Sequence, residues 1–146
     1  MIKVQENDFD INLEIKKITS HNKNIGGIGS FIGIVRGNDD ENLKSMTLEH
    51  YPIMTEKMLE KINSKARIRW KLIDSLIIHR YGKLYPGDQI VLVATFSQHR
   101  KDALESCEFL IDWLKTKAPF WKLEETSIGK NWVKEKNSDL DAAKKW

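Results

Sequence analysis

Apolar residues recur along the chain with two different periods, and these periods predict the order of its helices and strands. Ile11, Ile15 and Ile18 are spaced as on one face of a helix, and Asp10 stands where an N-cap residue is expected. The pattern therefore predicts a first, short helix over residues 10–20.

Two extended segments are expected after this helix. Residues 26–36 are rich in β-branched residues and glycine, which predicts a strand with a bulge or a close backbone approach. Residues 46–51 alternate, so every second residue from Met46 to His50 is expected to share one face of another strand. The polar segment between them, residues 37–42, predicts a loop.

Two long amphipathic helices are expected next. Pro52 breaks the preceding strand, and the helical period that follows it extends to about Trp70. The apolar face of this helix is predicted to consist of residues four positions apart: Met54, Met58, Ile62 and Ala66. The second helix spans residues 101–117 and stops before Pro119. Its apolar face is predicted to consist of Leu104, Cys107, Leu110 and Leu114.

The remaining segments decide the fold class. Residues 72–79 and 89–96 read as strands joined through a Pro-Gly turn, which predicts an antiparallel pair. Residues 120–125 predict a further strand, and residues 139–145 predict a terminal helix. Because helices and strands do not alternate in a regular βαβ rhythm, the expected class is α+β, in a single domain over residues 1–146.

Composition excludes several classes of protein. The chain has 146 residues, 40% of them apolar, which is enough for one core. Its longest apolar run, residues 90–94, is far shorter than the roughly 18–20 residues of a membrane span. The first residues lack the layout of a secretory signal, which predicts a cytoplasmic protein. Cys107 is the single cysteine, so no internal disulfide is possible, and its place on an apolar helix face favours a buried structural thiol.

Charge matters through its distribution. The formal net charge is only +3. Residues 115–146 contain eight basic and five acidic residues, so they hold an excess equal to that of the whole chain. This favours a local anion site over a general affinity for nucleic acid. The four histidines are scattered in sequence and no metalloprotease motif occurs, so no metal site is expected.

One candidate for that anion site is the pair His99-Arg100, at the passage from an apolar strand to the helix that begins near Lys101. Free backbone N–H groups and a guanidinium suit phosphate or carboxylate there. A solvated helix start explains the same residues equally well. Arg36, at the end of the glycine-bearing strand, offers a second guanidinium, although an arginine at a strand exit is more often simply exposed.

The second candidate is the pair Lys115 and Lys122. A lysine near a helix C-terminus is stabilising without any function, which is the simpler explanation of Lys115. If the chain reverses at Pro119, however, both ammonium groups can approach one cavity walled by Phe120 or Trp121. Desolvation and a neighbouring cation lower a lysine pKa, and a partly neutral lysine can act as a base or nucleophile.

Several short motifs, taken in their order and spacing, resemble one known family. They are Gly33-Ile34-Val35-Arg36, Thr47-Leu48-Glu49-His50-Tyr51, Met54-Thr55-Glu56-Lys57, His79-Arg80-Tyr81-Gly82, Pro86-Gly87-Asp88, His99-Arg100, Lys115-Thr116-Lys117-Ala118-Pro119-Phe120-Trp121-Lys122 and the terminal Ala142-Ala143-Lys144-Lys145-Trp146. Over residues 26–146 the chain is similar to the large, catalytic subunit of molybdopterin synthase. The first 25 residues carry little of the resemblance.

The resemblance implies an activity and an assembly. That family adds two sulfurs to cyclic pyranopterin monophosphate, forming the dithiolene of molybdopterin in molybdenum cofactor biosynthesis. The sulfur arrives as a C-terminal Gly-Gly thiocarboxylate on a small ubiquitin-like subunit. The implied fold is an α/β-hammerhead with a mainly antiparallel sheet and an additional small β subdomain. The implied assembly is a heterotetramer, a central homodimer with a small subunit at each end, and no cofactor is expected.

The resemblance also assigns roles to residues. Lys115 is implied as the leading catalytic residue and Lys122 as the second. Contacts with substrate or with the incoming tail are implied for Ile34, Val35, Arg36, His99, Arg100, Lys115, Lys122, Leu123 and Glu124. We expect Lys115 to activate the acyl-sulfur centre or aid proton transfer, while the other cations hold the phosphate. The sequence departs from the family in an acidic, shortened segment at residues 37–42, and Lys136 stands where relatives can carry arginine.

Two alternatives belong to other classes of protein. A non-catalytic binder of a ubiquitin-like sulfur carrier would keep a channel for the tail, but it would not need Arg36, Arg100 and Lys122 together. A small RNA-binding module would use the five tryptophans and the basic C-terminal region for stacking and phosphate contacts. The balanced overall charge argues against the RNA-binding module.

Overall fold

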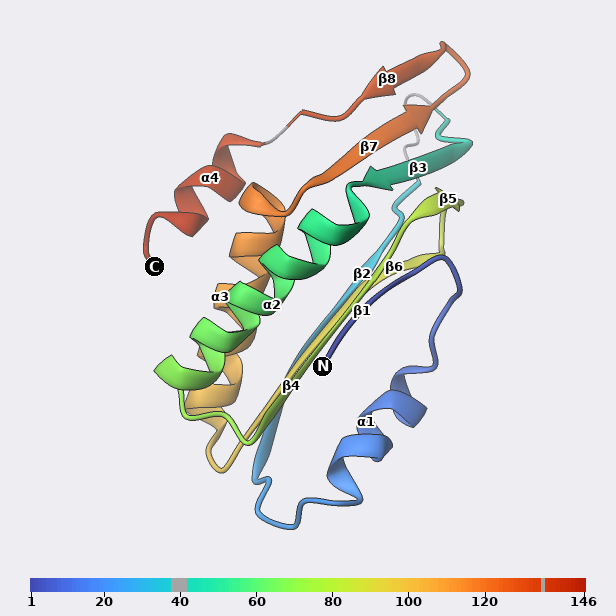
Figure 1. Ribbon diagram of the computed structural model, residues 1–146. Coiled ribbons are helices and arrows are strands. Elements are labelled where there is room, and N and C mark those ends of the chain that lie inside the picture. Colours follow the sequence, from blue (N-terminus) through green and yellow to red (C-terminus); the bar gives the residue numbers. More distant parts are fainter. Residues whose placement is uncertain (38–41, 135) are drawn as a thin grey trace.

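The structure is a computed structural model that describes residues 1–37, 42–134 and 136–146. Its class is α+β, as predicted, with two sheets and with helices on both sides of the larger one (Figure 1). In chain order the elements are β1 (Ile2–Gln5), α1 (Ile11–Thr19), β2 (Gly27–Ile34), β3 (Ser45–His50), α2 (Pro52–Arg69), β4 (Asp74–Arg80), β5 (Gly82–Leu84), β6 (Gln89–Ser97), α3 (Arg100–Lys117), β7 (Phe120–Glu125), β8 (Lys130–Trp132) and α4 (Asn137–Ala143).

The larger sheet has the strand order β1-β4-β6-β2 and helices on both faces. The antiparallel pairing of β4 with β6 confirms the predicted pair, whereas β1, which the sequence analysis did not predict, runs parallel to β4. Because side chains alternate along a strand, Ile77 and Val93 pack toward α2 and α3, while Leu76 and Leu92 pack toward α1. The sheet is thus the buried centre of the molecule, and its strand ends are held in fixed places.

A smaller antiparallel sheet, in the order β5-β3-β7-β8, lies beside the end of the larger one (Figure 1). Met46 and Leu48 are buried, whereas Glu49 and Tyr51 are exposed, so the predicted faces of this strand are confirmed. Leu84 of β5 completes its small core. The segment between the strands predicted at 72–79 and 89–96 therefore contains β5 in addition to the predicted turn. Most of the predicted loop at 37–42 lies outside the described residues.

The predicted helices are present, but their buried faces differ from the prediction. In α2, Met54 is 46% exposed, and the buried face contains Thr55, Leu59, Ile62, Asn63 and Ala66. In α3, Leu104 is 59% exposed, and the face turned to the core contains Ala103, Ser106, Cys107, Phe109 and Leu110. Ile62, Ala66, Cys107 and Leu110 are buried as predicted, but Thr55 and Ala103 take the buried positions beside the exposed Met54 and Leu104. Within the described residues, no helix is both long and apolar enough to cross a membrane.

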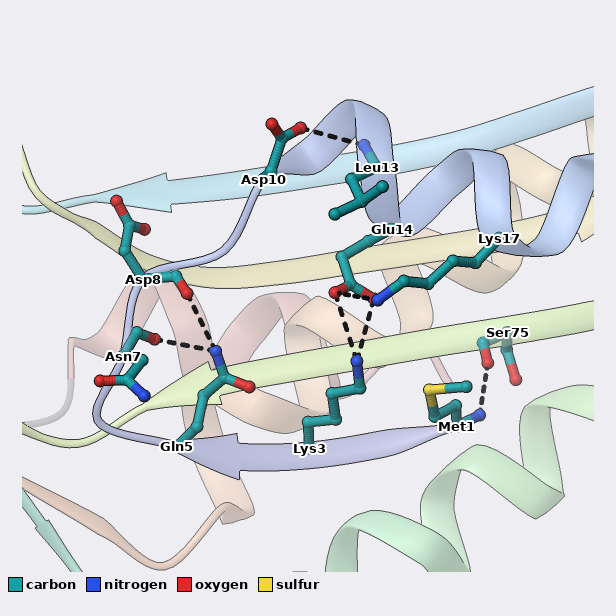
Figure 2. A network of polar contacts seen from close by, with 10 residues as sticks. All are labelled: Met1, Lys3, Gln5, Asn7, Asp8, Asp10, Leu13, Glu14, Lys17 and Ser75. Atoms are coloured by element: carbon teal, nitrogen blue, oxygen red, sulfur yellow. Dashed lines mark hydrogen bonds and ion pairs between the residues drawn. The ribbon is translucent and has the colours of Figure 1, made fainter.

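Polar contacts tie the N-terminal segment to the sheet and to α1 (Figure 2). Asp10 caps α1 by accepting a hydrogen bond from the backbone N–H of Leu13 at 3.0 Å, as predicted. The carboxylate of Glu14 lies between the ammonium groups of Lys3, at 3.0 Å, and Lys17, at 3.1 Å. Burial raises the pKa of Glu14, but the hydrogen bonds from both lysines outweigh it, so the net pKa is lowered. This corner is therefore a satisfied ion-pair network.

Strand β2 lies unusually close to α3. A Cβ atom on Gly29 would stand 2.2 Å from the carbonyl oxygen of Ala103, which excludes any side chain at this position. The pairing of β2 with β6 also shifts register between Gly33 and Ile34. Both the close approach and the bulge predicted from the glycines of this strand are thus present, and the bulge turns the chain toward the smaller sheet.

Candidate functional site

A cleft of about 960 Å³ lies where the two sheets meet the C-terminal end of α3. Residues 31–37, the end of α3, strand β7 and the segment leading into α4 form its walls. Among the described residues that line it, basic side chains outnumber acidic ones: Arg36, Lys115, Lys122, Lys134 and Lys136 against Glu124 and Asp139. The cleft therefore suits an anionic ligand.

Lys115 and Lys122 reach this cleft from the two sides of the turn at Pro119. Lys115 lies in the last turn of α3 and is exposed, whereas Lys122 is the third residue of β7 and half-buried. Phe120 and Glu124 line the same cleft as Lys122, because alternate residues of a strand share a face. Trp121 points the other way and packs edge-on against Tyr51, with ring centroids 4.8 Å apart. The wall is thus Phe120, one of the two aromatic residues expected there.

The surroundings of Lys122 change its acidity. Burial, followed by the charge of Lys115, lowers the pKa of Lys122 to about 8, although Asp139 and Glu124 act in the opposite direction. A lysine with this pKa is charged in most molecules at neutral pH, yet it releases its proton far more readily than an exposed lysine. Lys122 can therefore hold an anion and also exchange a proton with it.

The Arg36 side of the cleft is held by backbone hydrogen bonds. The N–H of Val35 donates to the carbonyl of Asp88 at 2.9 Å, and the N–H of Gly87 donates to the carbonyl of Val35 at 2.8 Å. The turn that contains Pro86-Gly87 thus fixes the chain after β2, and Ile34, Val35 and Arg36 all line the cleft. A motif that the sequence indicated only as a turn has a second use as a support for the site.

His79 of β4 also lines the cleft, and the sequence analysis gave it no role. Its ring stacks on Phe120 with centroids 3.7 Å apart and planes 13° apart, and Nδ1 lies 2.9 Å from the carbonyl oxygen of Arg80. Only 6% of the residue is exposed. Burial lowers the pKa of His79 to about 3. The charges of Lys122 and Lys115 also lower this pKa, whereas the hydrogen bond to the Arg80 carbonyl raises it. The imidazole is therefore neutral at physiological pH.

Three residues of the predicted site lie outside this cleft. His99 and Arg100 begin α3, and the helical rise places Arg100 about 22 Å from Lys115 along the same helix. Leu123 lies on the opposite face of β7 from Lys122. A single copy of the chain therefore unites Ile34, Val35, Arg36, Lys115, Lys122 and Glu124 in one cleft, but it does not bring His99, Arg100 or Leu123 into it.

The last wall of the cleft is α4 together with the residue before it. Lys136, Ser138 and Asp139 line the cleft, and α4 packs against α3. Cys107, in contrast, lies on the core side of α3, where burial raises the pKa of its thiol to about 12. The predicted structural role of Cys107 agrees with this inert environment. No group of three potential metal-ligating side chains occurs within residues 1–37, 42–134 and 136–146.

Comparisons with known proteins show the family to which the chain belongs. Residues 4–117 match the family model described as MoaE protein. The molybdopterin synthase catalytic subunit of Ralstonia nicotianae is 51% identical over 146 residues, covering 99% of this chain and 83% of that protein. A solved molybdopterin biosynthesis MoaE protein from Burkholderia ambifaria has a TM-score of 0.85 and 49% identity, covering 100% of this chain and 97% of that one.

A second solved structure contains two different subunits. It is a protein-protein complex of subunits 1 and 2 of molybdopterin-converting factor from Helicobacter pylori, with a TM-score of 0.77 and 26% identity, covering 92% of this chain and 91% of that one. The family-model match spans most of the chain, and the Ralstonia relative covers nearly all of it at high identity. The chain therefore belongs to the MoaE protein family, that of the molybdopterin synthase catalytic subunits.

Proposed function

We propose that this chain forms the dithiolene of molybdopterin by transferring sulfur from the C-terminal thiocarboxylate of a small ubiquitin-like subunit to cyclic pyranopterin monophosphate. The observation that carries the proposal is the convergence of Lys115, Lys122 and Arg36 on one cleft. A substrate that bears phosphate needs such a cluster of cations, and a reaction at an acyl-sulfur centre needs a proton donor or acceptor beside it. Membership of the MoaE family supports the same conclusion.

The roles of the cations follow from their surroundings. Arg36, fixed by the turn at Pro86-Gly87, can offer a planar pair of donors to a phosphate. Lys122, with its pKa near 8, can bind the same anion and exchange a proton with the reacting groups. Lys115 is exposed at the rim, where an incoming thiocarboxylate can reach it, so we assign it the activation of the acyl-sulfur centre.

The partner is part of the proposal. The Helicobacter pylori structure is a complex of two subunits of molybdopterin-converting factor. We infer that this chain likewise binds a small subunit, whose extended Gly-Gly tail enters the cleft. The assembly is then a heterotetramer with a central homodimer of this chain.

The homodimer accounts for His99 and Arg100. These residues lie at the far end of α3 from Lys115, so they reach the same substrate only if a second copy supplies them. Free N–H groups at the start of α3, together with the Arg100 guanidinium, suit the anionic part of the substrate. Each complete site is then built from two copies of the chain.

The decisive experiment combines the protein with thiocarboxylated small subunit and cyclic pyranopterin monophosphate and follows dithiolene product by mass spectrometry. Wild-type protein is expected to form product, and Lys115→Ala is expected to lose at least about a hundredfold in rate. Lys117→Ala is the matched control, since it removes an exposed lysine of the same helix that does not line the cleft. Stable binding of the small subunit without product in the wild type would favour a non-catalytic binder of sulfur-carrier proteins.

A further inference from the structure

His79 is a neutral polar group in a cleft whose charged side chains are mostly cationic. It comes from β4, in the middle of the larger sheet, and it is nearly fully buried. Phe120, on which it stacks, is the first residue of β7, and Lys122 follows two residues later on the same face. One step of two residues along a strand is about 6.6 Å, so the imidazole lies beside the Lys122 position.

The hydrogen bond of Nδ1 fixes the tautomer of this imidazole. A carbonyl oxygen only accepts, so Nδ1 must carry the hydrogen that it donates to the carbonyl of Arg80 at 2.9 Å. A neutral ring with hydrogen on Nδ1 has a lone pair on Nε2. The ring therefore presents one acceptor, at its distal edge, and the stacking on Phe120 holds that edge in one orientation.

This acceptor is open to the cleft. Within the described residues, Nε2 has no hydrogen-bond partner, whereas every fully enclosed side-chain nitrogen or oxygen has one. Nε2 is therefore not enclosed by protein, and the cavity that His79 lines is the cleft. The nearby Lys115 and Lys122 can only donate hydrogen bonds, and the carboxylates of the lining, Glu124 and Asp139, repel the anionic group of a ligand. A ligand that fills the cleft thus meets donors for its anionic group and, in His79, a fixed and uncharged acceptor beside them.

We infer that His79 binds the substrate directly, its Nε2 accepting a hydrogen bond from an N–H group of the pterin while the cations hold the phosphate. The inference rests on the proposed function, because it takes the substrate to be a phosphorylated pterin. Pterin rings carry N–H donors, and a buried donor without a partner weakens binding. His79 therefore favours a ligand that combines an anion with a hydrogen-bond donor over a ligand that offers the anion alone.

Two substitutions separate this role from a structural one. In His79→Asn the amide nitrogen can replace Nδ1 and keep the bond to the Arg80 carbonyl, but nothing reaches the Nε2 position. In His79→Gln the longer side chain can place its amide oxygen near the Nε2 position, but the bond to Arg80 is lost. Substrate dissociation constants of both variants are measured with cyclic pyranopterin monophosphate by calorimetry, without the small subunit.

The inference predicts that His79→Asn binds the substrate roughly three- to tenfold more weakly than His79→Gln, the effect of one neutral hydrogen bond. The opposite order would show that the contact with Arg80 and the orientation of the strand are what matter, and it would overturn the inference. Weaker binding of the small subunit by His79→Asn, with unchanged affinity for the pterin, would also overturn it. The small subunit is therefore titrated separately.

A measurement on the wild type keeps the inference testable even if the two variants misfold. The imidazole nitrogens of protein labelled with ¹⁵N-histidine are observed by NMR. The resonances of His79 are those that disappear from the spectrum of either variant. Addition of the substrate is expected to shift the unprotonated Nε2 resonance and to leave Nδ1 protonated. An unchanged Nε2 resonance at saturating substrate would overturn the inference. Failure of the wild type to form product with the small subunit would contradict the proposed function instead, since these binding measurements do not depend on turnover.

Discussion

Trp146 donates its indole N–H to the carboxylate of Asp112 in α3 at 2.6 Å. Its ring also meets Trp70 and Phe109 edge-on, with centroids 5.7 and 5.6 Å away, and the guanidinium of Arg69 lies over it. Trp146 follows α4 by three residues, and α4 forms one wall of the cleft. The contact therefore fastens that wall to the rest of the molecule.

Trp146→Ala is expected to lower the free energy of unfolding by about 1–3 kcal/mol, because it removes a hydrogen bond and two aromatic contacts. It is also expected to raise the KM for the pterin several-fold with a smaller change in kcat, since α4 loses its anchor. Thermal unfolding and steady-state kinetics measure the two effects. Lys144→Ala, which breaks only the exposed ion pair with Asp141, is the control and should change neither. An unchanged KM in a destabilised Trp146→Ala protein would mean that the contacts of Trp146 stabilise the fold but do not position α4 for substrate binding.

Lys122→Met is expected to abolish activity and yet stabilise the fold. The pKa of Lys122 is lowered to about 8 in the folded protein, from about 10.4 in an unfolded chain. Between these values the unfolded chain binds more protons, so the stability of the wild type rises with pH in this window and is diminished below pH 8. The charge of Lys122 thus destabilises the folded chain at pH 7.

Unfolding is therefore measured at pH 7 and at pH 9.5 for wild type and variant. At pH 7 we expect Lys122→Met to melt roughly 2–5 °C higher than the wild type, the effect of about 1 kcal/mol on a domain of this size. At pH 9.5 the difference should shrink. The matched variant Lys117→Met, on the exposed side of α3, should melt like the wild type at both pH values. A gain that is independent of pH would point to packing by methionine rather than to the lost charge.

Gly29→Ala tests the close approach of β2 to α3. The new methyl group would lie 2.2 Å from a backbone oxygen, which has no free space to move into, so we expect a loss of at least about 2 kcal/mol in the free energy of unfolding. Gly37→Ala is the control, because its methyl group would meet only Pro86, at 3.9 Å. Denaturant unfolding of both variants measures the difference. Equal stability of the two would mean that β2 can slide away from α3 without cost.

Arg100 and Lys115, at opposite ends of α3, allow a test of the shared site. Arg100→Ala and Lys115→Ala are each expected to be inactive as homodimers if every site takes Arg100 from one copy and Lys115 from the other. Mixed in equal amounts under conditions of subunit exchange, they should recover about a quarter of wild-type activity, because half the dimers then contain one intact site. The measurement is product formation before and after exchange. No recovery, despite proven exchange, would mean that each site takes Arg100 and Lys115 from the same copy.

Much of the fold could be predicted because its larger elements carry clear periods. The four helices and the pair β4–β6 follow from spacing alone. Strands β1, β5 and β8 have only three or four residues, too few for a period to show, and they form because neighbouring strands offer hydrogen-bond partners. The prediction that Met54 and Leu104 are buried is wrong because hydrophobicity alone cannot show that the smaller neighbours Thr55 and Ala103 pack inside instead.

The candidate site was predictable where it is local. Lys115 and Lys122 are separated by a single turn, so their approach follows from the proline between them. No site role was predicted for His79, because its place in the cleft depends on the stacking with Phe120 from a distant strand. Arg100 illustrates the opposite difficulty, since its chemistry is evident from the sequence, whereas its distance from Lys115 depends on the uninterrupted helix between them.

The cleft lies between two sheets that share no strand. Its width therefore depends on how the two sheets pack, not on a continuous ladder of backbone hydrogen bonds. Arg36 extends from the side of the larger sheet, and Lys122 belongs to the smaller one. A ligand that binds both residues connects the two sheets. We therefore expect a bound ligand to restrict the motion of one sheet relative to the other, a restriction that the empty cleft does not impose.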